Sequence, residues 1–304
     1  MEKGFKPLFR GANPTVQRFF VFVIIGFAVV IVSVFGGFYE AGGPFMVLIQ
    51  PAEFMIIGGA GLGALLASAP KNVLHQILAK SIGALKGETV TKATYLSVLK
   101  LMYELLYMAQ KEGLIALEKH IETPTESAIF SKYADILSQS TLISFMTDTF
   151  RMVIIGGIAS HDLEALMEGD MDTHHNDLRK PSVILSKIGD TMPGLGIVAA
   201  VLGIVITMQA IDGPAGEIGK KVAAALVGTF LGILLCYGFI QPLASNLEIA
   251  SEKEMQVFEV VKNAISAFAR GFSPLVCVEF ARRSIPGEVR PEFPEMEAHV
   301  KDKN

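Results

Sequence analysis

The chain has 304 residues, of which 51% are hydrophobic and 18% charged, and its formal net charge at pH 7 is −4. A soluble domain of this length is usually less apolar, and the balance of charge excludes a basic nucleic-acid-binding surface. The two cysteines, Cys236 and Cys277, do not indicate a disulfide framework, because Cys236 lies within an apolar run. Composition therefore points to a membrane protein.

Four apolar runs predict membrane-spanning helices, because about 20 helical residues cross roughly 30 Å of hydrocarbon. They cover residues 19–38, 54–69, 192–211 and 222–240. The second run is short and would need local thinning of the bilayer or protein cover. None of the four contains Asp, Glu, Lys, Arg or His, so the chain is expected to have no titrating group inside the membrane. A buried core helix could explain any one run, but four together predict an all-α polytopic membrane protein.

The distribution of Lys and Arg predicts the orientation of these spans. Residues 1–18 carry four basic residues, segment 70–191 carries twelve and the tail after Pro242 carries eight. The connection 39–53 carries none, and 212–221 carries only two, both at its end. We therefore expect both termini in the cytoplasm and the two short loops on the outer side.

This organisation divides the chain into five segments. They are a cytoplasmic basic N-terminal extension, a first pair of spans with a short periplasmic loop, a cytoplasmic helical domain, a second pair of spans with a short periplasmic loop, and a cytoplasmic C-terminal helix and tail: 1–18, 19–69, 70–191, 192–240 and 241–304. The N-terminal extension is expected to form either a basic amphipathic collar at the membrane surface or a disordered tail.

The segment between spans two and three is predicted to be helical. Apolar residues in "TKATYLSVLKLMYELLYMAQKEG" recur at close to helical period, and Gly113 is expected to end that helix. In "TPTESAIF", Thr123 is expected to be an N-cap, with Pro124 at the first helical position and Glu126 completing a capping box. "STLISFMTDTFRMVIIGGI" predicts a further amphipathic helix, and no alternation long enough for a sheet occurs.

Spans three and four each carry a stripe of small residues at steps of four, three and four. The stripe of span three contains Gly196, Ala200, Gly203 and Thr207. The stripe of span four contains Ala225, Thr229, Gly232 and Cys236. Such faces mark close helix–helix contacts in lipid. Packing of these spans on each other or on spans one and two is one interpretation, and a surface that receives another chain is the second.

Two prolines bracket the cytoplasmic ends of these spans. Each removes a backbone donor and disfavours helical geometry in the preceding residue. Pro242 is interpreted as the end of a helix. Pro193 lies inside a helical pattern that begins near Ser182, so it is expected to kink the helix and to serve as a hinge.

At these residues the sequence resembles the flagellar stator A subunit, the MotA/PomA family, over nearly the whole chain from about Val21. The most specific stretches are "VFGGFYEAGGPFMVLIQPAEFMIIGGAGLGALL", "LIALEKHIETPTESAIF", "IGDTMPGLGIVAAVLGIV", "VGTFLGILLCYGFIQPLA" and "RPEFPEMEAHV". The resemblance implies an inner-membrane protein that surrounds a dimer of a single-span, MotB-like B subunit, as a pentamer. The membrane Asp of the B subunit would carry the ion, and the cytoplasmic helices would push the rotor protein FliG.

The resemblance also implies roles for individual residues. Thr229 matches a threonine that lines the ion path, and Pro193 and Pro242 match prolines that couple ion passage to conformational change. The other ion-path and partner-facing positions are Ala200, Gly196, Gly203, Thr207, Ala225 and Gly232.

Two further positions bear on the rotor contact and on the ion. Glu118 matches a charged rotor-contact residue, whereas Gln110 stands where the family often has arginine, so Lys111 is the candidate basic partner. Ala200 occupies the position of a second threonine in sodium-driven members. A methyl group cannot coordinate sodium, which favours the proton.

Three alternative functions fit the sequence less well. A proton-channel energiser of the ExbB/TolQ type would have three spans and an outward N-terminus. The four predicted spans and the basic N-terminus of this chain argue against it. A membrane-embedded enzyme would need a polar catalytic cluster near the spans, and none is present, so neither catalysis nor a cofactor is expected. A self-sufficient channel is disfavoured by the absence of intramembrane charge.

"DMDTHHND", residues 170–177, lacks the spacing of an EF-hand or an H-x-x-x-H motif, so no metal site is predicted there.

Overall fold

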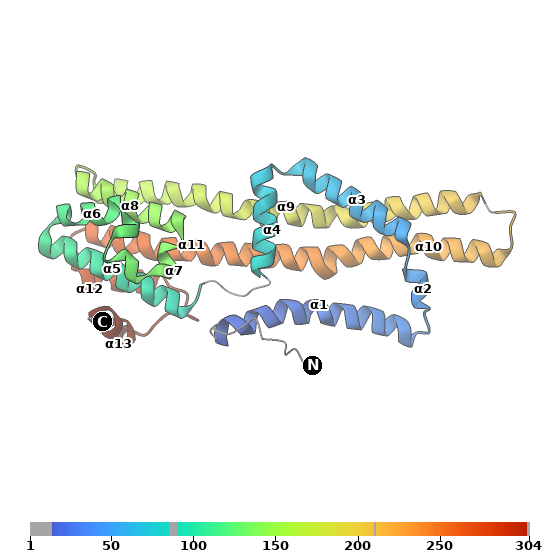
Figure 1. Cartoon of the computed structure of the whole chain (residues 1–304), viewed down its shortest axis with the longest axis horizontal. Coiled ribbons are helices and arrows are strands. Elements are labelled where there is room, and N and C mark those ends of the chain that lie inside the picture. Colours follow the sequence, from blue (N-terminus) through green and yellow to red (C-terminus); the bar gives the residue numbers. More distant parts are fainter. Residues whose placement is uncertain (1–13, 85–89, 210, 303–304) are drawn as a thin grey trace, which may run out of the picture. The chain divides into compact units, whose positions relative to one another are not determined.

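The computed structural model describes residues 14–84, 90–209 and 211–302, and every regular element in these ranges is a helix (Figure 1). Most of the expected N-terminal extension lies outside the described residues. The chain forms two compact units. The membrane unit contains the part of the chain up to Glu88 together with Arg179–Ala250, and the second unit contains Thr89–Leu178 and the chain from Ser251 onward.

Four helical segments in the described residues are long and apolar enough to cross a membrane, as predicted. They are Phe22–Glu40, Phe45–Ser68, Ser160–Met208 and Ala215–Ala269. The first segment lies within helix α1 (Pro14–Glu40). The second contains α2 (Phe45–Leu48) and α3 (Pro51–Ser68), and α4 (Lys71–Ala84) follows it. The last two contain α9 (Ser160–Met208) and the consecutive helices α10 (Ala215–Ile233), η4 (Leu234–Ile240) and α11 (Gln241–Ala269).

The expectation that Pro242 ends a helix is wrong, because the helix continues from α10 through η4 into α11. A proline has no N–H to donate to the carbonyl four residues earlier, and its ring crowds that carbonyl. The element η4, which ends two residues before Pro242, is a π-helix, whose hydrogen bonds run to the fifth residue instead. This change of hydrogen-bond pattern accommodates the proline. Pro193 likewise lies inside α9 without ending it.

The second candidate span of the structure extends beyond the predicted run 54–69, and the extension contains a charged residue. Glu53 lies in the first turn of α3, inside the second candidate span, and is only 6% exposed. The predicted apolar run begins at the next residue, Phe54. In the structure, Pro51 occupies the first turn of α3 and starts the helix earlier, as proline commonly does.

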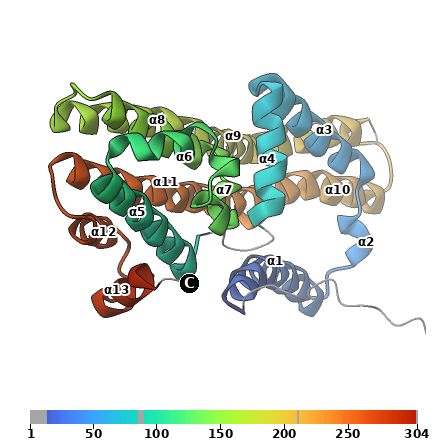
Figure 2. The ribbon, with the colours of Figure 1, turned by 60° about the vertical axis from the view of Figure 1, so that its left-hand side comes forward.

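The membrane unit is built around α9 and α10, which lie side by side (Figures 1 and 2). Helix α1 packs against η4, which directly follows α10, and there the ring centroids of Phe27 and Phe239 are 5.2 Å apart. Helix α4 packs through Val73 and Ile77 into an apolar cluster that includes Leu247 of α11. Many apolar side chains of the spans remain exposed, as lipid or other protein chains require. On α9 they include Ile197, Val198, Val201, Leu202, Val205 and Ile206.

The second unit has α5 (Lys92–Glu112) in its core, capped at its start by Thr91 and Thr94 and followed by Gly113 at φ 91°. The predicted end of this helix at Gly113 is therefore confirmed, and the predicted amphipathic helix is α8 (Ser140–Ile155). The shorter elements are η1 (Leu114–Leu117), α6 (Glu118–Glu122), η2 (Pro124–Glu126), η3 (Phe130–Lys132), α7 (Ala134–Leu137), α12 (Pro274–Arg283) and α13 (Phe293–Lys301).

The capping box expected at Thr123 does not form. Pro124–Glu126 is a single 3₁₀ turn without a side-chain cap, and the Thr123 hydroxyl instead donates to the Lys119 carbonyl, 3.3 Å away. The buried Ser127 takes over the role, because its Oγ accepts from the backbone N–H groups of Ile129 and Phe130, both at 3.2 Å. Its Oγ is also 2.7 Å from Nδ1 of the buried His120. Ser127 thus satisfies three polar groups in the interior.

We expect Ser127→Ala to lower the free energy of unfolding by about 2–3 kcal/mol, because buried donors left without a partner typically cost about 1–3 kcal/mol. The measurement is thermal unfolding of the detergent-solubilised protein. Ser138→Ala is the matched control, since the Ser138 hydroxyl donates to the Asp135 carbonyl at an exposed position. Equal melting temperatures for the two variants would contradict the proposed role of Ser127.

Candidate functional site

Helices α9 and α10 approach each other through glycine. A Cβ atom on Gly196 would lie 2.7 Å from the Gly228 carbonyl oxygen and 3.2 Å from Cα of Gly232. A Cβ atom on Gly232 would overlap the carbonyl oxygen of Met192. Because real Cβ atoms do not approach backbone atoms this closely, the two helices can take this spacing only where these side chains are absent.

The predicted small-residue stripes of spans three and four therefore lie in one contact between α9 and α10. Farther along, a Cβ atom on Gly203 would lie 2.7 Å from Cβ of Ala225, which is itself only 1% exposed. Thr207 is fully buried, and its hydroxyl donates to the Gly203 carbonyl at 2.8 Å. Ala200 is 8% exposed. Of the two interpretations of the stripes, the structure places spans three and four against each other, and Thr229 is left half-buried beside the contact.

Glu53 of α3 reaches the same contact. A Cβ atom on Gly228 would lie 2.5 Å from Oε2 of Glu53, and one on Gly203 would lie 3.6 Å from its Oε1. Oε2 is buried and has no hydrogen-bond partner in the described part of the chain. Sequence reasoning missed this residue, although a signal exists: Glu53, Ile57 and Gly61 follow steps of four along α3, and all are buried.

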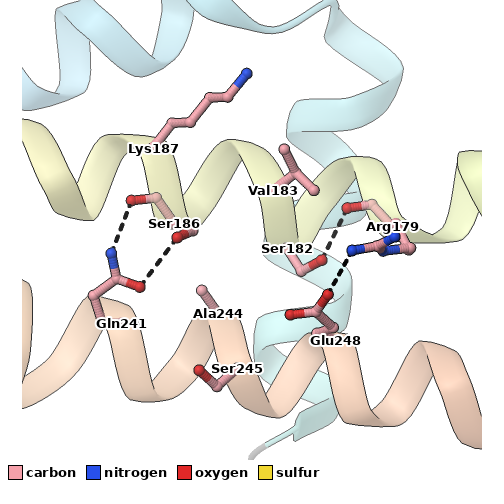
Figure 3. Close-up of a pocket in the computed structure, with 9 residues that line it drawn as sticks. All are labelled: Arg179, Ser182, Val183, Ser186, Lys187, Gln241, Ala244, Ser245 and Glu248. Carbon is pink, nitrogen blue, oxygen red and sulfur yellow. Dashed lines mark hydrogen bonds and ion pairs between the residues drawn. The ribbon is translucent and has the colours of Figure 1, made fainter.

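A polar bridge links α9 to α11 (Figure 3). It is close in the sequence to the two prolines. The Ser186 hydroxyl donates to the side-chain oxygen of Gln241 at 3.1 Å, and Gln241 Nε2 is 3.2 Å from the Ser186 carbonyl. Gln241 Nε2 also donates to the Asp190 carboxylate at 2.6 Å. Asp190 precedes Pro193 by three residues and Gln241 precedes Pro242 directly, so the bridge fixes the two chain segments just where the prolines weaken the helices.

The polar bridge borders a pocket of about 320 Å³ in the membrane unit. At its far end the Arg179 guanidinium contacts the Glu248 carboxylate at 2.8 Å (Figure 3). The lining is mostly polar and consists of Arg179, Ser182, Val183, Ser186, Lys187, Gln241, Ala244, Ser245 and Glu248. Since about half of each charged partner is exposed, this ion pair contributes little to stability.

The predicted rotor-contact residues lie close together in the sequence of the second unit. Lys111 is in the last turn of α5 and Glu118 begins α6, with the Gly113 turn between them. Both are exposed, as are Gln110 and the strongly apolar Ile115 between them. The Lys111 ammonium lies 6.0 Å from the centre of the Tyr107 ring. One exposed turn therefore presents a cation, an anion and an apolar side chain.

These features define a polytopic helical membrane protein whose spans meet through a glycine contact with a carboxylate beside it. Two family comparisons agree. Residues 24–113 match the family described as Motility protein A N-terminal, and residues 137–260 match the MotA/TolQ/ExbB proton channel family. The first description names motility protein A, so the ExbB/TolQ alternative is not better supported.

Similar proteins narrow the assignment. The chain is 39% identical to "Motility protein A" of Salmonella typhimurium over 92% of this chain and 95% of that protein. It is 38% identical to "Chemotaxis protein LafT" of Vibrio parahaemolyticus over 90% of this chain and 96% of that protein. The chain therefore belongs to the motility protein A family. It is a stator subunit of the bacterial flagellar motor and not an enzyme.

Solved structures confirm the fold. The MotAB structure of C. jejuni superposes with a TM-score of 0.71 at 19% identity, covering 88% of this chain and 96% of that chain. The flagellar MotAB stator complex of Bacillus subtilis gives a TM-score of 0.69 at 23% identity with the same coverage. The all-α membrane architecture is thus shared with these proteins.

We expect Gly232→Ala to abolish motility while the protein still inserts, because a methyl group would overlap the Met192 carbonyl and force α9 and α10 apart. Overpacking of this kind typically costs about 1–3 kcal/mol. Gly219→Ala, in the same helix α10 with no atom within 4 Å of the added Cβ, is the matched control. Swimming speed and the amount of protein in the membrane are measured together, and equal speeds for the two variants would contradict the importance of this contact.

Proposed function

We propose that this subunit assembles as a pentamer around a dimer of a single-span, MotB-like B subunit and that proton flow between them drives rotation. The observation that carries the proposal is the similarity to motility protein A along nearly the whole chain. The related solved structures are titled as MotAB complexes, which supports a B partner. The exposed apolar side chains of α9, such as Ile197, Val201 and Val205, also support further helices or lipid packed around this chain.

The ion path is proposed to run beside the α9–α10 contact. Thr229 is half-buried there and offers a hydroxyl, whereas Ala200 offers only a methyl group. Gly196, Gly203, Ala225 and Gly232 would shape this path by letting the two helices approach closely, and Thr207 would line it as a buried residue. A sodium ion without its water shell needs several oxygen ligands, but a proton needs only a carboxylate and a neighbouring acceptor. The coupling ion is therefore proposed to be the proton.

The two prolines are proposed to couple ion passage to movement. Pro193 and Pro242 lie within continuous helices and next to the polar bridge of Ser186, Gln241 and Asp190. A helix that lacks one backbone hydrogen bond bends at lower cost, and discrete kinks arise at such positions. In this proposal the chain has both termini in the cytoplasm of the inner membrane, as the distribution of Lys and Arg predicts.

The choice of ion can be tested in swimming cells that depend on this protein. A protonophore is expected to stop swimming, whereas replacing external sodium with potassium at constant ionic strength should leave the speed unchanged. The physical reason is that Thr229 offers a hydroxyl at the proposed path, whereas Ala200 offers only a methyl group. A speed that rises and saturates with sodium, and survives the protonophore at alkaline pH, would overturn the assignment to protons.

The rotor contact is proposed to use the exposed turn that carries Lys111 and Glu118. Its partner would be a surface of FliG with the opposite pattern of charge, because complementary charges guide encounter and fix the register of an interface. Tyr107 and Ile115 would add apolar contact, since 48% and 77% of their surfaces are exposed.

We expect Glu118→Lys and Lys111→Glu each to slow or stop motility without affecting insertion, because reversal turns attraction into repulsion. A matched charge reversal on FliG should restore part of the speed. Lys119→Glu changes the charge of a neighbouring exposed residue and serves as the control. Normal swimming of both variants, or equal loss in the control, would show that the contact lies elsewhere.

A further inference from the structure

Glu53 is an ionisable side chain that the proposed function does not use. Its carboxyl group is enclosed by α3, α9 and α10 in the membrane unit, and only 6% of the residue is exposed. The enclosure is made by positions without large side chains. Gly228 and Gly203 lie next to the two carboxyl oxygens, and Ala199 and Ala225 lie next to these glycines.

The carboxyl group lies inside the apolar zone. Gly203, its neighbour, precedes the end of α9 at Met208 by five residues, which places it about 7–8 Å from that end at 1.5 Å per residue. The residues that follow Gly203 on α9, Ile204, Val205 and Ile206, are about half exposed and apolar, as expected of a lipid-facing surface. Gly228 directly precedes Thr229 in α10, so the Glu53 carboxyl group lies near the level of Thr229, which is proposed to line the ion path.

The chemistry of this enclosure selects a proton as the ligand. An isolated carboxylate is costly in a medium of low dielectric constant, and protonation removes that cost. Oε2 has no hydrogen-bond partner among the described residues, so it is the free atom that a proton can occupy. Glycine and alanine supply no side-chain oxygen, and the backbone carbonyls of α9 and α10 are engaged in the helices. A dehydrated metal cation would therefore find too few ligands.

We propose that Glu53 is a proton-binding residue of this subunit, located at the outer half of the proposed ion path and loaded with a proton at Oε2. Binding and release convert the carboxylate into the carboxylic acid and back, with no other group changed. The glycines at 203 and 228 provide the space for the carboxyl group. The proposal rests on the proposed proton-driven function and adds an ionisable group on this chain to the one expected on the B subunit.

The test compares the wild-type complex of this chain and its B partner with complexes that carry one of three variants. Glu53→Gln keeps the size of the side chain but cannot exchange a proton, whereas Glu53→Asp keeps the carboxyl group. We expect Glu53→Gln to reduce proton flux into liposomes, and swimming speed, at least tenfold while the complex still assembles. Glu53→Asp should retain part of the flux with an altered dependence on external pH. Glu217→Gln, at an exposed position in the first turn of α10, should behave as the wild type.

Proton flux in Glu53→Gln equal to that of the wild type would overturn the proposal, because a merely structural role is preserved by glutamine. If this variant fails to assemble, labelling of the wild-type complex decides. Dicyclohexylcarbodiimide reacts with protonated carboxyl groups in apolar surroundings, so mass spectrometry should find its adduct on Glu53, decreasing as the pH is raised. No adduct on Glu53 would also overturn the proposal.

Failure of the proposed function gives a different result. A wild-type complex that moves on sodium, and is insensitive to a protonophore, would contradict the proton-driven mechanism whatever residue stands at position 53. Labelling of Glu53 would then still show whether this carboxyl group binds a proton. The two outcomes are therefore distinguishable in the same set of preparations.

Discussion

The membrane unit depends on the close approach of the α9 and α10 backbones at Gly196 and Gly232. In a bilayer, association of helices gains little from hydrophobic expulsion, because lipid is as apolar as a leucine side chain. Packing over a smooth surface must supply the attraction instead. The near overlap of the Gly232 Cβ position with the Met192 carbonyl shows that no larger residue is compatible with this spacing. The same spacing places Gly203 and Gly228 where the Glu53 side chain can enter.

The helices that form this contact also continue beyond the membrane unit. Helix α9 begins at Ser160 in the second unit, and α11 ends at Ala269 there. Within that unit, Lys262 of α11 lies 3.1 Å from the Glu168 carboxylate of α9 and 3.1 Å from that of Glu259. Because the ammonium group is nearly buried, removing a partner would leave a poorly solvated charge. The two long helices are thus tied to each other on both sides of the prolines.

Much of this architecture could be predicted from the sequence, because apolar runs and helical period depend on local composition. The four spans, the end of α5 at Gly113 and the amphipathic helix α8 were predicted in this way. The prediction of a capping box at Thr123 was wrong because a buried contact between His120 and Ser127 determines the turn, and these two residues are seven positions apart in the sequence. Such a contact cannot be predicted from the pattern of neighbouring residues in the sequence. The stripes themselves were visible, but which surface they contact depends on tertiary structure.

Glu53 shows most clearly where sequence reasoning fails. A carboxylate at the start of an apolar run is normally the boundary of a span, since charged groups stay in water. Its burial here depends on residues about 150 and 175 positions farther along the chain, Gly203 and Gly228, which have no side chains. Small residues in a membrane helix are usually interpreted as a surface for another helix. In this protein, the same glycines serve two purposes: they bring α9 and α10 together, and they leave room for one ionisable group between them. A substitution at Gly228 would therefore disturb both the helix contact and the carboxyl site, whereas one at Gly232 acts on the contact alone.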